Sequence, residues 1–281
     1  MSYRTKKVKI PSKGGCLKLL ILTPREKQTT TPAADDTRGR VGVLWIHGGG
    51  YITGMAGMVH MSRAKNLVKK YGAVVISPAY RLAGEAPYPA ALEDCHTALL
   101  YLKQHAAELG VRPDQIMVGG ESAGGGLAAA LCMYEKDTGG VNIAFQMPLY
   151  PMLDCEETET SRDNHAPVWN TKRNRYGWKK YLAGLTGEVP CYASAARRKD
   201  YTGLPPAYTF VSTAEPFYAE TVTYIGNLRG AGAPAEIDIY PGLYHAFDML
   251  TPLRRVSRIA GARFDDHFLY AQKHYFAKQK G

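Results

Sequence analysis

Gly120-Glu121-Ser122-Ala123-Gly124 is the stretch of this 281-residue sequence that decides the fold. An apolar run at 115–118 precedes it, and a small-residue helical pattern at 127–134 follows it. This context predicts that a strand enters the serine and a helix leaves it. Such a strand–turn–helix forces the serine into a strained backbone conformation and lifts its hydroxyl clear at the carboxyl end of a sheet. Glycine is needed on both sides because any side chain there would collide across so tight a turn.

Two other interpretations of the glycine-rich turn stay open at this point. The first is a helix start that packs closely on its strand and carries no chemistry. The second, a phosphate-binding loop, is less favoured because no Gly-Lys-Ser or Gly-Lys-Thr follows and no lysine is near. Ser122 therefore needs partners elsewhere in the chain before it can act as a nucleophile.

Composition and cysteine usage indicate an ordinary globular protein. Apolar residues make up 45% and charged residues 21% of the chain, which is long enough for one large or two small domains. The five cysteines are an odd number without a C-x-x-C motif, as in reduced intracellular thiols. The first seven residues do not lead into a signal peptide, and no apolar run approaches the roughly 18 residues needed to cross a bilayer. We therefore expect a cytoplasmic protein without a membrane span.

The formal net charge of +10 invites a nucleic-acid or membrane interpretation. The basic residues are spread over several segments, however, and no nucleic-acid-binding motif accompanies them. A solvated basic surface is the favoured interpretation, and no nucleic-acid partner is expected.

Strand and helix patterns alternate along most of the chain. Two short apolar runs at 8–10 and 17–22 predict an opening β-hairpin, and the polar segment 29–40 predicts an exposed loop. Further strands are expected at 41–46, 73–77, 115–118, 141–150, 207–212 and 235–240, and helices at 59–70, 91–109 and 127–134. Alternation of this kind predicts an α/β protein with a mainly parallel, eight-stranded sheet and helices on both faces.

The segment 154–204 interrupts this rhythm. It is polar and rich in aromatic residues, and its one expected helix is short, at 176–182. A connection of about fifty residues inside a compact domain is usually functional, so we expect a lid inserted into a single domain that spans residues 1–281. The alternative is a small subdomain that does not contact substrate.

Three candidate groups follow strands whose carboxyl ends share one edge of a parallel sheet. His47-Gly48-Gly49-Gly50 follows the strand at 41–46, Glu215 follows the strand at 207–212, and His245 follows the strand at 235–240. The order Ser122, Glu215, His245 is that of a Ser–acid–His triad on an α/β-hydrolase sheet. The backbone N–H groups of Gly48, Gly49 and Ala123 are the expected oxyanion donors.

Each of these assignments has an alternative. His47 is expected only to fix its turn by hydrogen bonding. Glu215 competes with Asp248, Glu220 and Asp154 as the acid, although Asp248 lies only three residues past the histidine, too close to approach the ring from a different strand.

Several motifs together resemble the hormone-sensitive-lipase-like family of α/β-hydrolases, which includes bacterial carboxylesterases and acetylesterases. The resemblance runs from about residue 41 to the C-terminus. The matching stretches are His47-Gly48-Gly49-Gly50, Tyr80-Arg81-Leu82-Ala83-Gly84-Glu85, Pro89-Ala90-Ala91-Leu92-Glu93-Asp94, Gly120-Glu121-Ser122-Ala123-Gly124-Gly125, Leu204-Pro205-Pro206-Ala207 and Gly242-Leu243-Tyr244-His245-Ala246-Phe247.

The sequence departs from the family pattern at several positions. Glu121 and Ala79 stand where the family usually has aspartate, and Gly84 stands where it has proline. Glu215-Pro216-Phe217 replaces the usual Asp-Pro-Leu, so the triad acid would be a glutamate. The family also carries a helical cap before its first strand. Here the opening hairpin uses the residues before 41, so a reduced cap is expected.

The resemblance implies a serine carboxylesterase that works through an acyl-enzyme and needs no metal or organic cofactor. Its expected partner is a small ester, and Tyr51 and Glu121 are the expected substrate-binding residues. Because the lid at 154–204 is charged, it is expected to offer little continuous apolar wall, which favours acetyl to butyryl esters and polar alcohol parts such as acetylated sugars. A second subunit, as in a homodimer, is the alternative source of such a wall.

Two other functions stay open, namely an acyltransferase with the same site and a non-catalytic ligand receptor on the same fold.

Overall fold

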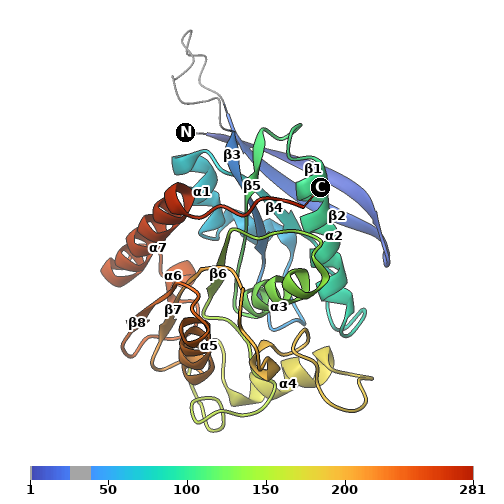
Figure 1. Ribbon diagram of the computed structural model, residues 1–281. Coiled ribbons are helices and arrows are strands. Elements are labelled where there is room, and N and C mark those ends of the chain that lie inside the picture. Colours follow the sequence, from blue (N-terminus) through green and yellow to red (C-terminus); the bar gives the residue numbers. More distant parts are fainter. Residues whose placement is uncertain (1, 26–38, 281) are drawn as a thin grey trace.

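A single eight-stranded sheet forms the centre of the computed structural model, which describes residues 2–25 and 39–280 (Figure 1). Its strands lie in the order β1-β2-β4-β3-β5-β6-β7-β8. The pairs β1–β2 and β2–β4 are antiparallel and all others are parallel, which confirms the predicted mainly parallel sheet. The strands are β1 (Tyr3–Ser12), β2 (Gly15–Pro24), β3 (Arg40–Ile46), β4 (Val74–Pro78), β5 (Val111–Glu121), β6 (Phe145–Leu149), β7 (Ala207–Ser212) and β8 (Ala235–Tyr240).

Helices cover both faces of the sheet. α1 and α7 pack on one face, and α2, α3 and α5 lie on the other. The helices are α1 (Ala64–Tyr71), α2 (Ala90–Gln104), α3 (Ala123–Thr138), α4 (Thr171–Tyr181), α5 (Tyr218–Gly230), α6 (Phe247–Leu250) and α7 (Arg255–His274), with 3₁₀ turns at η2 (Ala56–His60) and η3 (Ala195–Arg197).

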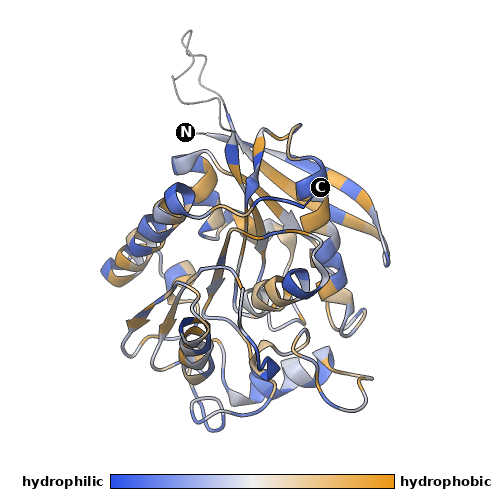
Figure 2. Cartoon of the chain, in the orientation of Figure 1, coloured by the Kyte–Doolittle hydropathy of each residue, from blue (hydrophilic) through white to orange (hydrophobic). Residues whose placement is uncertain are grey.

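The period of two along β3 explains why its sequence is an unbroken apolar run. Val43 and Trp45 belong to the core shared with α1 and α7, whereas Leu44 and Ile46 belong to the core shared with α2 and α3. A strand buried on both faces has no position left for a polar side chain. Figure 2 shows the same contrast, with hydrophobic central strands and hydrophilic outer helix surfaces.

The predicted elements differ from the observed ones mainly at their ends. The opening hairpin is confirmed and longer than expected. The helix expected at 59–70 is broken, because the Ser62 hydroxyl bonds to Val59 O and accepts the Ala64 N–H, which starts α1 anew. The helix expected at 91–109 ends at Gln104 and is followed by turns up to Gly110, whose φ of +64° leads the chain into β5. Most of the polar loop expected at 29–40 lies outside the described residues.

Two of the family-like stretches meet through an ion pair. Arg81 follows β4, and its Nε and Nη2 bind the two carboxylate oxygens of Asp94 at 2.9 and 3.0 Å. The Arg81 backbone N–H donates to the same carboxylate, and Asp94 is buried in the first turns of α2. This paired, bidentate contact fixes the start of α2 against the loop after β4.

The segment 154–204 joins β6 to β7 and crosses the loops that follow β3 and β7. Asn164 Nδ2 donates to Ala214 O at 3.1 Å, and the Thr160 hydroxyl donates to Pro216 O at 2.8 Å. α4, in yellow at the bottom of Figure 1, lies at this end of the molecule. No helix in the described part of the chain is long and apolar enough to cross a membrane.

Candidate active site

Ser122 occupies the sharp turn between β5 and α3, as the sequence predicts. Its backbone is at φ 58° and ψ −122°, a conformation that is strained for a residue with a side chain. A Cβ on Gly120 would lie 2.5 Å from Gly124 O, and one on Gly124 would lie 2.2 Å from Ile46 O. Both glycines are therefore required by the close approach of the backbone on either side of the serine.

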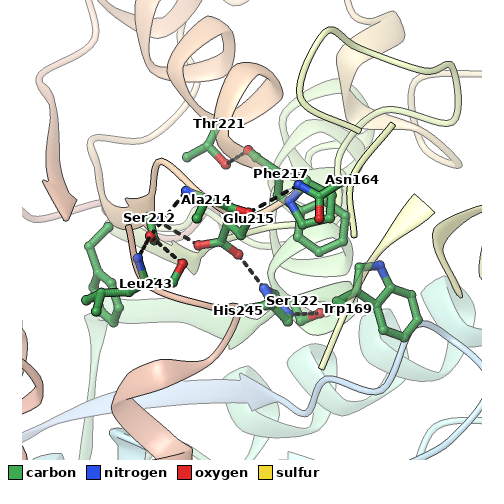
Figure 3. Close-up of polar contacts among 12 residues, drawn as sticks. Ser122, Asn164, Trp169, Ser212, Ala214, Glu215, Phe217, Thr221, Leu243 and His245 are labelled. Carbon is green, nitrogen blue, oxygen red and sulfur yellow. Dashed lines mark hydrogen bonds and ion pairs between the residues drawn. The ribbon is translucent and has the colours of Figure 1, made fainter. Parts of the chain in front are cut away.

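Ser122, His245 and Glu215 come together from three separate loops (Figure 3). Ser122 Oγ lies 2.8 Å from His245 Nε2, and His245 Nδ1 bonds to Glu215 Oε2. All three side chains are buried. The arrangement provides a hydroxyl, a base within hydrogen-bond reach of it, and a carboxylate on the far nitrogen of that base.

The other candidate acids are engaged elsewhere. Asp248 pairs with Arg63 Nε at 2.8 Å, and Asp154 pairs with Arg197 at 2.6 Å. Glu220 accepts the Leu153 N–H at 2.7 Å. Glu215 is the carboxylate that contacts His245.

Ser212 and Asn164 hold the acid and histidine loops, and the sequence analysis did not single them out. The Ser212 N–H donates to Glu215 Oε1 at 2.8 Å, which fixes the carboxylate from its second oxygen. The Ser212 hydroxyl donates to Leu243 O at 2.6 Å and accepts the Leu243 N–H at 2.8 Å. Asn164 ties the same loop to the 154–204 segment through Ala214 O. No sequence motif marks either residue, because their partners are backbone atoms far along the chain.

Two aromatic rings fix the plane of His245. Tyr150 and Phe217 each meet the imidazole in a T-shaped arrangement, with centroids 5.0 and 5.1 Å away. Both rings are buried, so the imidazole has little freedom to rotate away from Ser122.

The expected oxyanion donors surround the serine. A Cβ on Gly48 would lie 3.2 Å from Ser122 Cβ, so the backbone of this loop approaches the nucleophile directly. Gly49 is at φ +122° and accepts hydrogen bonds from the Ile52 and Thr53 N–H groups, which holds the loop in shape. Ala123 is the first residue of α3, where backbone N–H groups have no intrahelical partner.

His47 takes the supporting position expected of it. Its Nδ1 lies 2.7 Å from Gly48 O, and its ring stacks on Tyr80 at 4.2 Å. Burial lowers the pKa of His47 to about 4, so the ring is neutral and Nδ1 carries the proton that Gly48 O accepts.

Tyr51 does not line the cavity in which Ser122 lies. Its hydroxyl donates to Met152 O at 3.1 Å, and its ring stacks on Tyr181 at 3.9 Å. This position lends no support to the predicted contact of Tyr51 with substrate, which stays a prediction. The ring instead forms part of the base on which α4 rests.

Glu121 lies beside Ser122 and reaches the cavity wall. Its Oε2 accepts the indole N–H of Trp45 at 2.8 Å, whereas Oε1 has no hydrogen-bond partner within the described residues. Burial, with a smaller contribution from the nearby Asp248, raises the pKa of Glu121 to about 8. Its expected contact with substrate stays a prediction.

The cavity above Ser122 has a volume of about 1590 Å³. Its wall is partly apolar. This wall comes from several loops rather than from the 154–204 segment alone. The apolar lining consists of Ile52, Met58, Tyr150, Val168, Trp169, Tyr176, Met249 and Leu250. In the part of the chain that is described, no group of His, Cys, Asp and Glu side chains could hold a metal ion.

Comparison with known proteins identifies the family of the chain. A family profile described as the alpha/beta hydrolase fold matches residues 43–249. Esterase LipI of Mycobacterium tuberculosis is 31% identical over 77% of this chain and 68% of its own length. An acetyl-hydrolase of Streptomyces hygroscopicus is 31% identical over 82% of this chain and 76% of its own length. The solved structure of a bacterial heroin esterase superposes with a TM-score of 0.84 at 33% identity, covering 93% of this chain and 82% of that one.

The chain thus belongs to the α/β-hydrolase fold family and, within it, to the hormone-sensitive-lipase-like carboxylic ester hydrolases. It spans about two thirds of the length of the first two relatives, the second being carboxylesterase NlhH of Mycobacterium tuberculosis at 66%.

Glu121→Gln should change how stability depends on pH. The folded protein keeps the Glu121 proton up to about pH 8, whereas the unfolded chain releases it near 4.5. Between these values the unfolded state binds fewer protons, so the wild type loses up to about 1.4 kcal/mol of stability per pH unit as the pH rises. Glutamine can still accept the Trp45 N–H without this loss. Urea unfolding at pH 5 and pH 8 measures this effect. The free energy of unfolding of the variant, relative to that of the wild type, should be larger at pH 8 than at pH 5. An equal difference at both pH values would contradict the burial of a neutral carboxyl.

Proposed function

We propose that this carboxylic ester hydrolase works through a Ser122–His245–Glu215 triad and an acyl-enzyme. The observation that carries the proposal is the hydrogen-bonded series from Ser122 Oγ through His245 to Glu215. Its relatives support the substrate class, since they are named esterase, carboxylesterase and acetyl-hydrolase.

In the proposed mechanism, His245 Nε2 takes the proton from Ser122 Oγ as the oxygen attacks the ester carbonyl. Glu215 accepts a hydrogen bond from His245 Nδ1–H, which keeps Nε2 free as the base, and its charge then stabilises the imidazolium. The N–H groups of Gly48, Gly49 and Ala123 bind the tetrahedral oxyanion, and each is worth about 3 kcal/mol of barrier. His245 returns the proton to the leaving alcohol. Water then attacks the carbonyl of the acyl-enzyme with His245 as the base, which releases the carboxylic acid and restores Ser122.

We further propose that residues 1–281 form one domain and that the insertion at 154–204 acts as its lid. The hydrogen bonds from Asn164 and Thr160 to the loop of Glu215 support this role, because they couple the insertion to the triad. Leu250, at the cavity, and Leu253 are 55% and 85% exposed, which supports a second subunit covering that side. None of the five cysteines is paired, which supports a cytoplasmic location.

Acetyl to butyryl esters are the proposed substrates. The indole of Trp169 closes the cavity against the glycine loop, because a Cβ on Gly50 would lie 2.0 Å from it. Figure 3 shows the same ring beside Ser122 and His245. Polar alcohol parts, acetylated sugars among them, fit the amide side chains Asn164 and Asn170, which also line the cavity.

Ser122→Ala should leave a folded protein whose kcat for an aryl acetate falls by about 10⁴-fold or more, because no other group can form the acyl-enzyme. A fluorophosphonate should modify the peptide containing Ser122 in the wild type and nothing in the variant, as read by mass spectrometry. Ser77→Ala, which removes a buried hydroxyl bonded to Ala56 O, is the control and should keep both properties. Activity near the wild-type level in Ser122→Ala would exclude this nucleophile.

Glu215→Gln should lower kcat by about 10³- to 10⁴-fold while the fold persists. Two N–H donors, from Ser212 and from His245, face the carboxylate, and an amide can accept only one of them through oxygen. Asp248→Asn should instead lower stability, because Arg63 loses its buried charged partner, and change kcat by less than about tenfold. Steady-state kinetics and urea unfolding of both variants check the assignment, and the reverse ranking in kcat would make Asp248 the acid.

The acyl-chain series should give the highest kcat/KM at two to four carbons. A longer chain gains about 0.8 kcal/mol per buried methylene only where a channel receives it, and Trp169 closes that side. Trp169→Ala should move the optimum to longer chains. Hydrolysis of p-nitrophenyl esters from two to twelve carbons measures both, and a wild-type optimum at eight carbons or beyond would contradict the proposal.

A further inference from the structure

α4 has two chemically distinct faces. Asn174, Gly177, Trp178 and Tyr181 are buried, at the spacing of one helix face. Trp178 and Tyr181 pack on Tyr51, and a Cβ on Gly177 would lie 2.9 Å from Gly50 O. The helix therefore rests directly on the glycine loop beside Ser122, and its orientation is fixed.

The opposite face of α4 is cationic and lines the cavity of Ser122. Lys172, Arg175, Tyr176 and Lys179 recur at the same helical spacing, and all four are exposed and contribute to the cavity wall. The helix contains no acidic residue over its whole length. Because the buried face is held on the loop, the cationic face cannot turn away from the cavity.

Other charges at the cavity offset this face only in part. Arg162 and Arg173 also line the wall, which makes five cationic side chains. The exposed Asp163 lines the wall too and interacts electrostatically with Arg175, while its neighbour His165 is charged only when protonated. Arg175 also pairs with Glu157, on which the charge of Arg162 acts as well. Lys172 and Lys179 form no ion pair within the described residues, and Glu121 is buried and neutral below about pH 8.

A group of unpaired cations in a concave, partly apolar site attracts anions more strongly than the same charges on a flat surface. The sequence analysis interpreted the excess positive charge as a solvated surface. α4 is part of the 154–204 segment, at the lower end of the molecule in Figure 1. The lining residues put its charges in one cavity with Ser122.

We propose that this cavity selects esters that carry an anionic group, a carboxylate or a phosphate, away from the scissile carbonyl. The cations lie on the lid helix rather than on the glycine loop, so they meet a part of the substrate other than the reacting carbonyl. This inference rests on the proposed serine esterase activity and specifies its substrate class.

The test compares matched esters that differ in charge alone. On the alcohol side, 4-acetoxybenzoate is compared with the neutral 4-acetoxybenzamide, and 4-(acetoxymethyl)phenyl phosphate is compared with the neutral 4-(acetoxymethyl)benzamide. The p-nitrophenyl monoester of adipic acid and that of its monoamide test the acyl side. After correction for spontaneous hydrolysis, kcat/KM should favour the anionic member on one side by about fivefold at about 0.01 M salt. The preference should approach one at about 1 M salt, where the screening length is about 3 Å.

Lys172→Glu/Lys179→Glu should reverse this preference while activity on neutral p-nitrophenyl acetate stays within about threefold of wild type. Lys180→Glu/Lys199→Glu is the matched control, because it changes the net charge equally at exposed positions that do not line the cavity. It should reduce the preference much less than the cavity variant does, because its charges act on the cavity only from a distance.

The proposal is overturned if the wild type shows no preference for anionic esters on either side, if the preference does not depend on salt, or if the control reduces it as much as the cavity variant. The proposed mechanism is tested separately, by the activity of Ser122→Ala on the neutral ester. If this variant is inactive, the mechanism stands even where the charge preference is absent. If Ser122→Ala still hydrolyses the neutral ester, the mechanism fails whatever the charge preference is.

Discussion

The turn at Ser122 is the constraint on which the site depends, because it holds a residue with a side chain at φ 58°. Three backbone hydrogen bonds determine this conformation. The Ser122 N–H donates to Leu149 O, and Ser122 O accepts from the N–H groups of Gly126 and Met152. The backbone of Ser122 is therefore held by hydrogen bonds to α3, to the end of β6 and to the chain that follows β6. Strain of about 1–3 kcal/mol persists only where the surroundings fix the backbone in this way.

The same principle extends from the serine to its partners. Ser212 joins the carboxylate of Glu215 to the backbone of the histidine loop, so these two loops cannot move independently. Asn164 adds the 154–204 segment to the same unit. A movement of this segment would therefore displace the loop of Glu215. It would not displace Ser122, which lies at the junction of β5 and α3.

The sequence predicts the sheet and the candidate residues Ser122, Glu215 and His245, because both predictions depend on local patterns. The strand at 207–212 coincides with β7 and that at 235–240 with β8, and the serine, acid and histidine each follow a strand. Interactions between distant segments could not be predicted. The position of Tyr51, for example, depends on stacking with Tyr181. The break at Ser62 is local, but it depends on a hydrogen bond from the Ser62 hydroxyl to Val59 O that no apolar pattern marks. Likewise, the apolar part of the cavity wall is assembled from loops that no periodicity connects.

Glu121 shows how burial can reconcile an acidic residue with a site that must stabilise negative charge. An ionised carboxylate next to Ser122 would oppose the oxyanion, and it would do so strongly in a region from which water is excluded. The pKa near 8 keeps the side chain neutral over most of the physiological range, and the Trp45 indole holds it in place without supplying a positive charge. Positive charge stands instead on α4, separated from the reacting centre by the cavity. The proposed enzyme thus leaves its backbone N–H groups as the main partners of the oxyanion and uses its cations on the more distant part of the substrate.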